Sequence, residues 1–250
     1  MKKNIIILLL LALGATQARC EDIFSNLVYY ARAGYSVGGT APVGMPATIR
    51  SLSKYTLQPN VTLALDAYKP LGGHWGIMAG FHIENKGMKT DARVKNYHME
   101  MRRGGESLEG MFTGQVITDV EEWMITLPFQ AAYNVSDKVR LRLGPYLSYV
   151  LSNDFSGIAY GGYLRVGSPV GNKVEIGTGS GSQGTYDFSD DLRRLQFGVD
   201  FGADWEFSQT WGVYFDLSWG LTGIFKSDFN TIEQTLYPIY GTIGLTYKFK

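Results

Sequence analysis

The stretch from Trp123 to Leu151 reads WMITLPFQAAYNVSDKVRLRLGPYLSYVL, and it decides the fold class. On both sides of the central NVSDK (134–138), apolar side chains occupy every second position over more than ten residues. A period of two is typical of β-strands, whose successive side chains point to opposite faces. One face is apolar throughout, whereas the other carries Arg140 and Arg142. Long strands with one lipid-compatible face and one polar face are typical of transmembrane β-barrels.

Further segments repeat this alternation. Together with the hairpin at 123–133 and 139–151, they are 29–37, 60–68, 75–84, 195–207, 211–221 and 239–249. Their connections alternate between short, at 70–74, 134–138 and 208–210, and long, at 38–57, 87–121, 152–194 and 223–238. Short turns on one rim and long loops on the other indicate an outer-membrane barrel. We therefore predict an all-β fold, an eight-stranded antiparallel up-and-down transmembrane β-barrel with short periplasmic turns and long extracellular loops.

The N-terminus has the features of a secretory signal peptide. A basic start is followed by an apolar stretch (5–13) and a small-residue cleavage site, and the whole is too short for a membrane anchor. We expect cleavage after Ala18, with cleavage after Cys20 as the alternative. Lipidation of Cys20 is the weaker interpretation because the bulky, charged Arg19 precedes it. The predicted domains are the signal peptide (1–18), a short periplasmic segment (19–27) and the outer-membrane barrel (28–250).

Composition excludes several classes of protein. The formal net charge is zero and charged residues make up 18% of the chain, so no basic field is available to bind nucleic acid. Cys20 is the single cysteine, so no internal disulfide can form. No run of eighteen apolar residues follows the signal peptide, which leaves a closed barrel as the way to span a membrane. We therefore place the protein in the outer membrane of a Gram-negative bacterium.

Aromatic residues of the apolar face gather at the strand ends. Near the short turns and the C-terminus we predict a periplasmic aromatic belt of Trp75, Tyr133, Trp205, Phe207, Trp211 and Phe249. Toward the long loops lie Tyr35, Trp123, Tyr149 and Trp219. Two such belts are favoured by the two interfaces of a membrane. We expect outer-membrane lipids to contact the aliphatic band between them.

The polar face carries a charged layer near the short turns. The residues about four positions from that end of each strand are Arg32, Asp66, Met78, Gln130, Arg142, Asp204 and Asp216, with Arg140 and Glu206 just below. Side chains can fill an eight-stranded barrel, and buried charges need partners. We predict that this layer is a structural network that closes the lumen. In it, Arg142 should bond Asp204 at equal height, with Asp216 as its second partner.

One segment resembles a known family. EEWMITLPFQAAY…VRLRLGPYLSYVL is similar to the "YLEIPL…GPYLSYLL" core of the Bacteroidetes-type outer-membrane β-barrel family, often called porin family proteins. Further similar segments are GFHIENKG (80–87), DFSDDLRRLQFGVDFGADWEF (187–207), WGVYFDLSWGLTGI (211–224) and GLTYKF (244–249). The sequence departs from the family at WMIT (123–126), which replaces YLEI, and at Lys250, which follows the final aromatic residue. The resemblance covers 24–250 and implies a barrel without catalytic residues, recognised by the outer-membrane assembly machinery through Tyr247 and Phe249.

Signals for catalysis, metals or cofactors are weak. GSGSQG (179–184) fits GxGxxG but follows no predicted strand and opens no predicted helix, so a flexible loop is the better interpretation. The whole glycine-rich run 177–191 is expected to be mobile. His82 and Glu84 are the candidates for acid–base chemistry, but a polar role in the lumen is the better interpretation, and the histidines lack metal-ligand spacing. We predict a non-enzymatic protein with no catalytic residues, no metal and no cofactor.

The long loops are expected to carry the function, by binding an extracellular ligand or protein or by serving a structural role. Ala92–Met101 should pair with Met111–Val120 above the membrane, and 163–167 and 173–177 bracket a second hairpin. Two other classes stay open. A small passive pore or transporter would need ten or more strands, with loop hairpins recruited into the wall. A soluble lipocalin-like carrier would turn the apolar face inward.

Overall fold

The computed structural model describes residues 25–44, 46–229, 231–232 and 235–249, so the predicted signal peptide and most of the segment 19–27 lie outside the described residues. The strands are β1 (Val28–Pro42), β2 (Ile49–Thr56), β3 (Val61–Gly72), β4 (Trp75–Arg103), β5 (Glu106–Asn134), β6 (Val139–Val166), β7 (Lys173–Ile176), β8 (Gly184–Asp187), β9 (Leu195–Glu206), β10 (Trp211–Gly220) and β11 (Leu236–Lys248). A short 3₁₀ turn, η1 (Ser189–Asp191), precedes β9. No helix in these ranges is long and apolar enough to cross a membrane.

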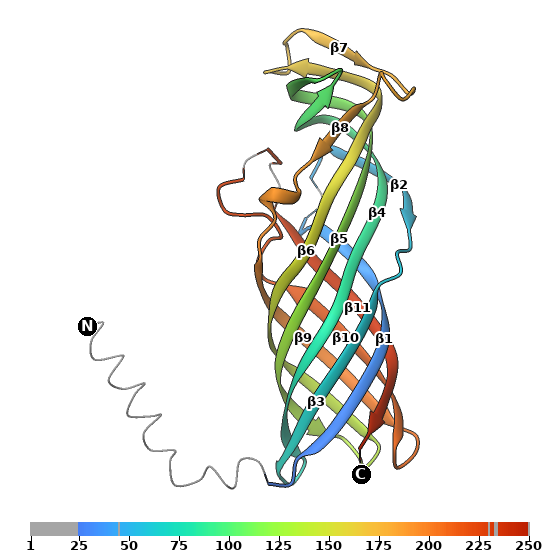
Figure 1. Cartoon of the computed structure of the whole chain (residues 1–250), viewed down its shortest axis with the longest axis vertical. Helices are drawn as coiled ribbons and strands as arrows, with labels where there is room; N and C mark the ends of the chain where they lie inside the picture. Colours follow the sequence, from blue (N-terminus) through green and yellow to red (C-terminus); the bar gives the residue numbers. More distant parts are fainter. Residues whose placement is uncertain (1–24, 45, 230, 233–234, 250) are drawn as a thin grey trace, which may run out of the picture.

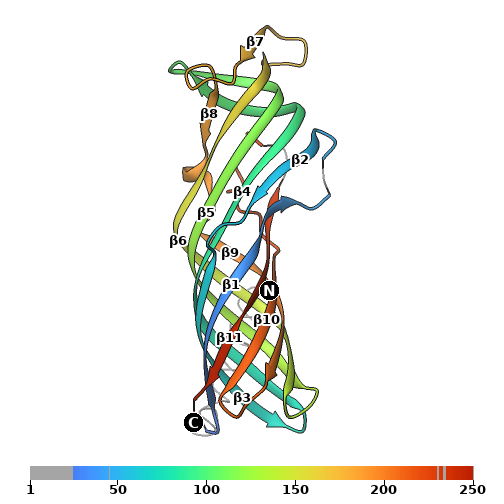
Figure 2. The same cartoon turned by 90° about the vertical axis from the view of Figure 1, so that its right-hand side faces the viewer.

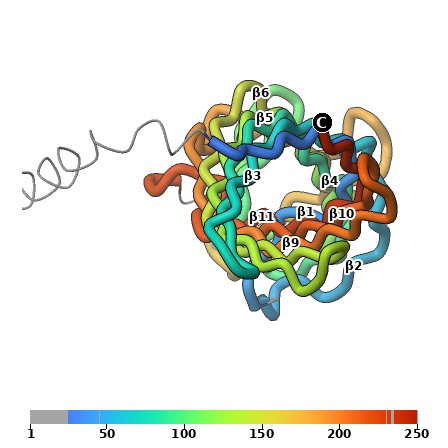
Figure 3. Tube along the Cα trace, turned by 90° about the horizontal axis from the view of Figure 1, so that it is seen from below, coloured from blue at the N-terminus to red at the C-terminus, as the bar shows by residue number. Residues whose placement is uncertain are grey.

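The sheet closes on itself. Antiparallel pairs run in the order β1, β3, β4, β5, β6, β9, β10 and β11, and β11 pairs back with β1. Within this order each strand pairs with the next one along the chain, which is the up-and-down barrel topology, and Figure 3 shows the ring from below. Closure pairs both edges of each of these strands, as a hydrocarbon environment requires.

Three strands lie outside this ring, so the sheet of the described residues has more strands than the eight predicted. β2 pairs with β4, β7 pairs with β6, and β8 pairs with β4 and β6. All three lie at the end opposite the short turns and the C-terminus (Figure 1). The extra strands therefore attach to the upper part of the sheet and are not inserted into the closed order of pairing.

The central strands are much longer than the sequence alternation predicted. β4 and β5 each have 29 residues and β6 has 28, and the three rise together far above the other strands of the ring (Figure 2). β4 and β5 stay paired up to Arg103 and Glu106, which confirms the predicted pairing of 92–101 with 111–120. Gly104 and Gly105 form the tip with φ of 59° and 89°, a conformation that glycine adopts readily. The pairing of β6 with β7 likewise confirms the second hairpin.

The prediction that the run 177–191 is mobile throughout is wrong. Its second half contains β8 and η1, and the side chains of Tyr186 and Phe188 are buried. The glycines of the first half dominate the composition of this run. This composition gives no sign that Tyr186 and Phe188 are buried, although their burial holds the second half against β4 and β6.

The two faces of the ring differ as predicted for a membrane barrel. Exposed apolar side chains cover the outer surface, among them Leu63, Phe81, Leu127, Leu143, Phe201, Phe215, Ile243 and Leu245. The interior is polar within the ring, and Arg142 there is only 1% exposed. The lipocalin-like alternative is wrong, because it requires the apolar side chains to point inward.

An apolar core lies in the interior above the ring. It contains Met88, Val94, Met99, Met101, Phe112, Val116, Val120, Phe155, Ala159, Leu164, Ile176, Tyr186, Phe188, Leu192, Ile224 and Phe225. On β4 the inward side chains change from Glu84 and Lys86 to Met88, all buried. The barrel therefore has a polar lower interior and an apolar upper interior.

Candidate functional site in the lumen and above it

Asp204 is the centre of the charged layer in the lumen. Its Oδ1 lies 2.9 Å from Nη1 of Arg32, its Oδ2 lies 2.9 Å from Nε of Arg142, and Oδ2 is 3.8 Å from Nη1 of Arg140. Arg32 also forms an ion pair with Asp66, with Nε 2.7 Å from Oδ2. β1, β3, β6 and β9 thus supply charges that meet in the middle of the barrel, where the side chains of Arg32, Asp66, Arg142 and Asp204 are almost fully buried.

Arg142 carries the network toward the opposite strands. Its Nη2 donates to Oδ1 of Asp216 on β10 at 2.6 Å, and its Nη1 donates to Oε1 of Gln130 on β5 at 2.8 Å. Arg32 donates to the sulfur of Met78 on β4 at 3.2 Å. With these contacts, all seven residues of the predicted layer are joined in one network.

Arg140 and Glu206 form the lower edge of the network. Arg140 Nη2 is 3.4 Å from Glu206 Oε1, and its guanidinium carbon lies 4.1 Å from the ring centre of Tyr68, a cation–π distance. Tyr30 donates to the same Glu206 oxygen at 3.0 Å, and Lys248 Nζ is 3.2 Å from Oε2. Aromatic rings and charges therefore pack together at the lower end of the lumen.

The predicted register of Arg142 and Asp204 is wrong by two residues. On the β6–β9 pair, Asp204 faces Arg140, and Arg142 faces Gly202. The contact exists because the long Arg142 side chain reaches diagonally along the strand. Strand tilt causes the offset, since residues counted equally from the turn of a tilted strand do not lie at equal height.

His82 and Glu84 are part of the same interior. His82 Nε2 is 2.8 Å from Oδ1 of Asp66, and Glu84 pairs with Lys86 Nζ at 3.1 Å and accepts a hydrogen bond from Thr126. The partners of His82 and Glu84 are therefore other side chains of the lumen, as expected for polar lumen residues. Among the described residues, no group of three or more His, Cys, Asp or Glu is arranged to hold a metal ion.

A small cavity remains between the lower network and the polar residues above it. Its volume is about 20 Å³, and its lining includes Arg32, His82 and Asp200. A space of this size, with polar walls, suffices for a single water molecule. The described side chains leave far less room here than a hydrated ion would need.

The predicted belt residues lie on the outer surface near the short turns. Trp75 stacks edge-on against Tyr133 with ring centres 4.9 Å apart, and Trp205 lies 6.1 Å from Phe207. Tyr247 packs against Trp211 at 5.0 Å and against Phe249 at 5.3 Å. All six predicted belt residues, Trp75, Tyr133, Trp205, Phe207, Trp211 and Phe249, are exposed.

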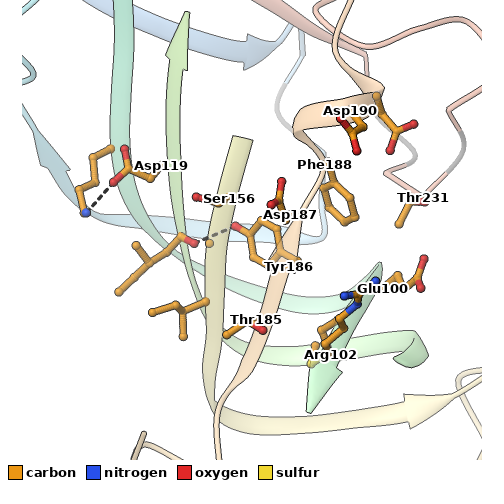
Figure 4. A pocket seen from close by; sticks show the side chains of 16 residues that line it. Glu100, Arg102, Asp119, Ser156, Thr185, Tyr186, Asp187, Phe188, Asp190 and Thr231 are labelled. Carbon is orange, nitrogen blue, oxygen red and sulfur yellow. Dashed lines mark hydrogen bonds and ion pairs between the residues drawn. The ribbon is translucent and has the colours of Figure 1, made fainter. Parts of the chain in front are cut away.

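Two cavities lie above the ring, and the sequence analysis identified neither. The first has a volume of about 780 Å³ and is bordered by Glu100, Asp119, Asp187 and Asp190 beside Arg102 (Figure 4). This basin is predominantly acidic and open to solvent.

The second cavity, of about 370 Å³, lies between the tops of β1 and β11 on one side and β2, β4 and β5 on the other. We call it the upper apolar cavity. Tyr186 and Phe188 line both cavities and separate them. The alternation Val116, Thr118, Val120 continues the inward face of β5 above Trp123, and this was the signal in the sequence that could have located the cavity wall.

Tyr186 and Asp187 show how the part above the ring is held. Burial raises the pKa of Tyr186 above its usual range, and its hydroxyl bonds Thr118 Oγ1 and the Ile117 carbonyl, each at 2.8 Å. Hydrogen bonds from the hydroxyl and the backbone N–H of Ser189 lower the pKa of Asp187. Tyr186 therefore stays neutral and Asp187 stays ionised near neutral pH.

A closed antiparallel ring with an apolar exterior and a polar interior defines a membrane β-barrel. Residues 17–226 match the family described as outer membrane protein beta-barrel domain. The chain belongs to this family. The protein is thus an integral β-barrel of the Gram-negative outer membrane.

The chain is also similar to solved outer-membrane structures. They include Ail, the attachment invasion locus protein of Yersinia pestis (10% identity, 89% of this chain and 97% of that chain, TM-score 0.37), CarO2 of Acinetobacter baumannii (12%, 89% and 98%, 0.42) and the outer membrane protein OprG of Pseudomonas aeruginosa (11%, 89% and 95%, 0.37). No curated protein matches the chain. The family match alone carries the assignment.

Proposed function

We propose that the protein is a non-enzymatic barrel with a wall of eight strands and a lumen closed by side chains, and that it acts through its extracellular part. The observation that carries this proposal is the junction of Asp204 with Arg32, Arg142 and Arg140 in the lumen. Each charge is compensated by a neighbour, which lowers the cost of burying it. A ring of eight strands is narrow enough for such side chains to occupy fully.

The extracellular part supports a binding or structural role. β4, β5 and β6 continue beyond the ring as a paired sheet with its own apolar core, and β2, β7 and β8 add to this sheet. Surface segments positioned by a rigid scaffold are the usual location of binding residues. Closure of the lumen does not require strands that extend this far above the ring.

Two finer assignments belong to the same proposal. We place the chain with the Bacteroidetes-type barrels, and GPYLSYVL (144–151) is the segment that supports this. We also propose that the outer-membrane assembly machinery recognises Tyr247 and Phe249. Their rings are in contact at the lower end of the barrel, where β11 ends.

Swelling of liposomes tests closure. Purified protein is incorporated into liposomes, which are then diluted into an isotonic solution of a small neutral sugar. We expect swelling no faster than in protein-free liposomes, because the network fills the lumen. Rapid swelling would contradict the proposal and favour the passive pore.

A further inference from the structure

We propose that the upper apolar cavity binds a neutral, largely apolar small molecule that carries at most one uncharged polar group. This inference rests on the proposed binding role of the extracellular part. It adds a defined site and a class of ligand to that role.

The residues that line the cavity determine the charge and the polarity of the ligand. The cavity is bordered by methionine, aromatic, aliphatic and threonine side chains, including Met88, Met99, Val94 and Phe155, and the described residues that line it include no Asp, Glu, Lys, Arg or His. An ionised ligand would lose its hydration there without gaining a countercharge, which is strongly unfavourable. Charged side chains are abundant in the neighbouring acidic basin. The apolar cavity is therefore distinct from the general surface.

The size and the walls suit a small molecule. A volume of about 370 Å³ lies at the lower end of the range for small-molecule sites, roughly 300–1,000 Å³. On one side, the Met88 side chain packs over Gly39, where an added Cβ would come within 2.5 Å of the Met88 sulfur. Methionine adapts its shape to apolar partners and makes favourable contacts with aromatic rings. These walls can close around an aromatic or aliphatic ligand.

One polar group of the lining lacks a partner. Thr40 lines the cavity and is 5% exposed, and its hydroxyl has no hydrogen-bond partner in the described structure. Buried hydroxyl groups are nearly always bonded. A hydroxyl or carbonyl on the ligand would supply the missing bond, which is why the proposal allows the ligand one uncharged polar group.

β2 forms the outer wall of the cavity. It pairs with β4 on one side, with register shifts after Ile49 and Leu52. Its further contacts include the packing of Ile49 against the apolar core and a hydrogen bond from the Tyr55 hydroxyl to the Gly38 carbonyl at 2.5 Å. Side chains 50–55 are exposed. A wall attached in this way can move aside to admit a ligand more easily than the continuous β4–β5–β6 sheet can.

Photolabelling tests the site directly. Full-length protein in phosphatidylcholine nanodiscs is irradiated with a neutral aryl-trifluoromethyl diazirine, and adducts are mapped by peptide mass spectrometry. We expect saturable labelling of 88–101, which lines the cavity, and non-saturable labelling of the lipid-facing 141–151. Naphthalen-2-ol should displace the saturable label, whereas naphthalene-2-sulfonate should not. Labelling confined to lipid-facing peptides, or equal displacement by both competitors, would overturn the proposal.

Variants locate the site. Ala92→Phe fills the cavity from β4 and should abolish the saturable label, whereas Ala67→Phe, the same change on the outer face of β3, should preserve it. Thr40→Val should weaken displacement by naphthalen-2-ol about two- to tenfold relative to naphthalene, the loss of one hydrogen bond. Saturable labelling unchanged in Ala92→Phe would contradict the location. The competition between the naphthalene compounds and the photolabel is measured in unmodified protein, so it does not depend on the folding of a variant. None of these results depends on whether the lumen conducts.

Discussion

The Arg142 side chain lies across the backbone of Gly202. The two residues face each other on β6 and β9, and a Cβ added to Gly202 would lie 2.6 Å from Cζ of Arg142 and 2.2 Å from Oδ1 of Asp216. Because Gly202 has no side chain, the guanidinium of Arg142 on β6 can extend over β9 and reach Asp216 on β10. The charged network in the lumen depends on the absence of a side chain at this position as well as on its charges.

Gly202→Ala should therefore destabilise the barrel. The added methyl group overlaps both Arg142 and Asp216, and such overpacking costs about 1–3 kcal/mol. Unfolding in urea, followed by the migration of the folded barrel on unheated gels, measures the loss. Gly181→Ala is the control, since a Cβ there meets nothing within 4 Å. Equal midpoints for the two variants would show that the space over Gly202 is not needed.

Arg142 and Asp204 should be energetically coupled. Arg142→Ala removes the bonds to Asp204 and Asp216 and should lower the free energy of unfolding by about 3–5 kcal/mol, because buried carboxylate charge loses its compensation. Adding Asp204→Asn should recover part of that loss, with a coupling of about 0.5–3 kcal/mol in a double-mutant cycle. Arg50→Ala on the exposed β2 should have no effect. Additive effects of the two lumen substitutions would rule out the pair as a stabilising contact.

The outer face should reject charge. Leu143 is 55% exposed on the outer surface of β6, and Leu143→Arg should cost about 2–4 kcal/mol if it faces the middle of the bilayer. Val170→Arg, in the connection between β6 and β7 where the side chain is 90% exposed, should be tolerated. The fraction of folded protein on unheated gels after refolding into lipid reports both. Normal folding of Leu143→Arg would refute the assignment of this face to lipid.

The orientation can be read from intact cells. A recognition site for a specific protease inserted after Gly181, in the open part of the run 177–183, should be cut by protease added outside. The same site inserted after Ser136, between β5 and β6, should be protected in the periplasm. Immunoblots of the fragments distinguish the two. Cleavage at Ser136 with protection at Gly181 would invert the topology.

The sequence predicted the ring because alternation is strong wherever one face is apolar and the other polar. Leu141, Leu143 and Leu147 alternate with Arg140, Arg142 and Ser148, so both the strand and its faces were recognisable. The charged layer was located for the same reason. Its register was not, because strand tilt and the reach of arginine do not appear in residue spacing.

The part above the ring was harder to predict because its inward face changes polarity. On β4, Glu84 and Lys86 give way to Met88, and both faces of the upper strands mix polar and apolar residues. The alternation that marks a membrane strand therefore fades while the strand continues. The burial of Tyr186 and Phe188 depends on contacts with β4 and β6 that are distant in sequence, so the glycine-rich composition misled the prediction.

Single-channel recording in planar lipid bilayers is the most direct test of the closed lumen. Purified protein that is folded by gel migration is added to the bilayer under voltage, beside the Arg142→Ala variant. The network of Asp204 with Arg32, Arg140 and Arg142 predicts no discrete conductance steps for the unmodified protein. Channel openings should be confined to the Arg142→Ala variant. Regular, long-lived conductance steps from the unmodified barrel would contradict closure by these side chains.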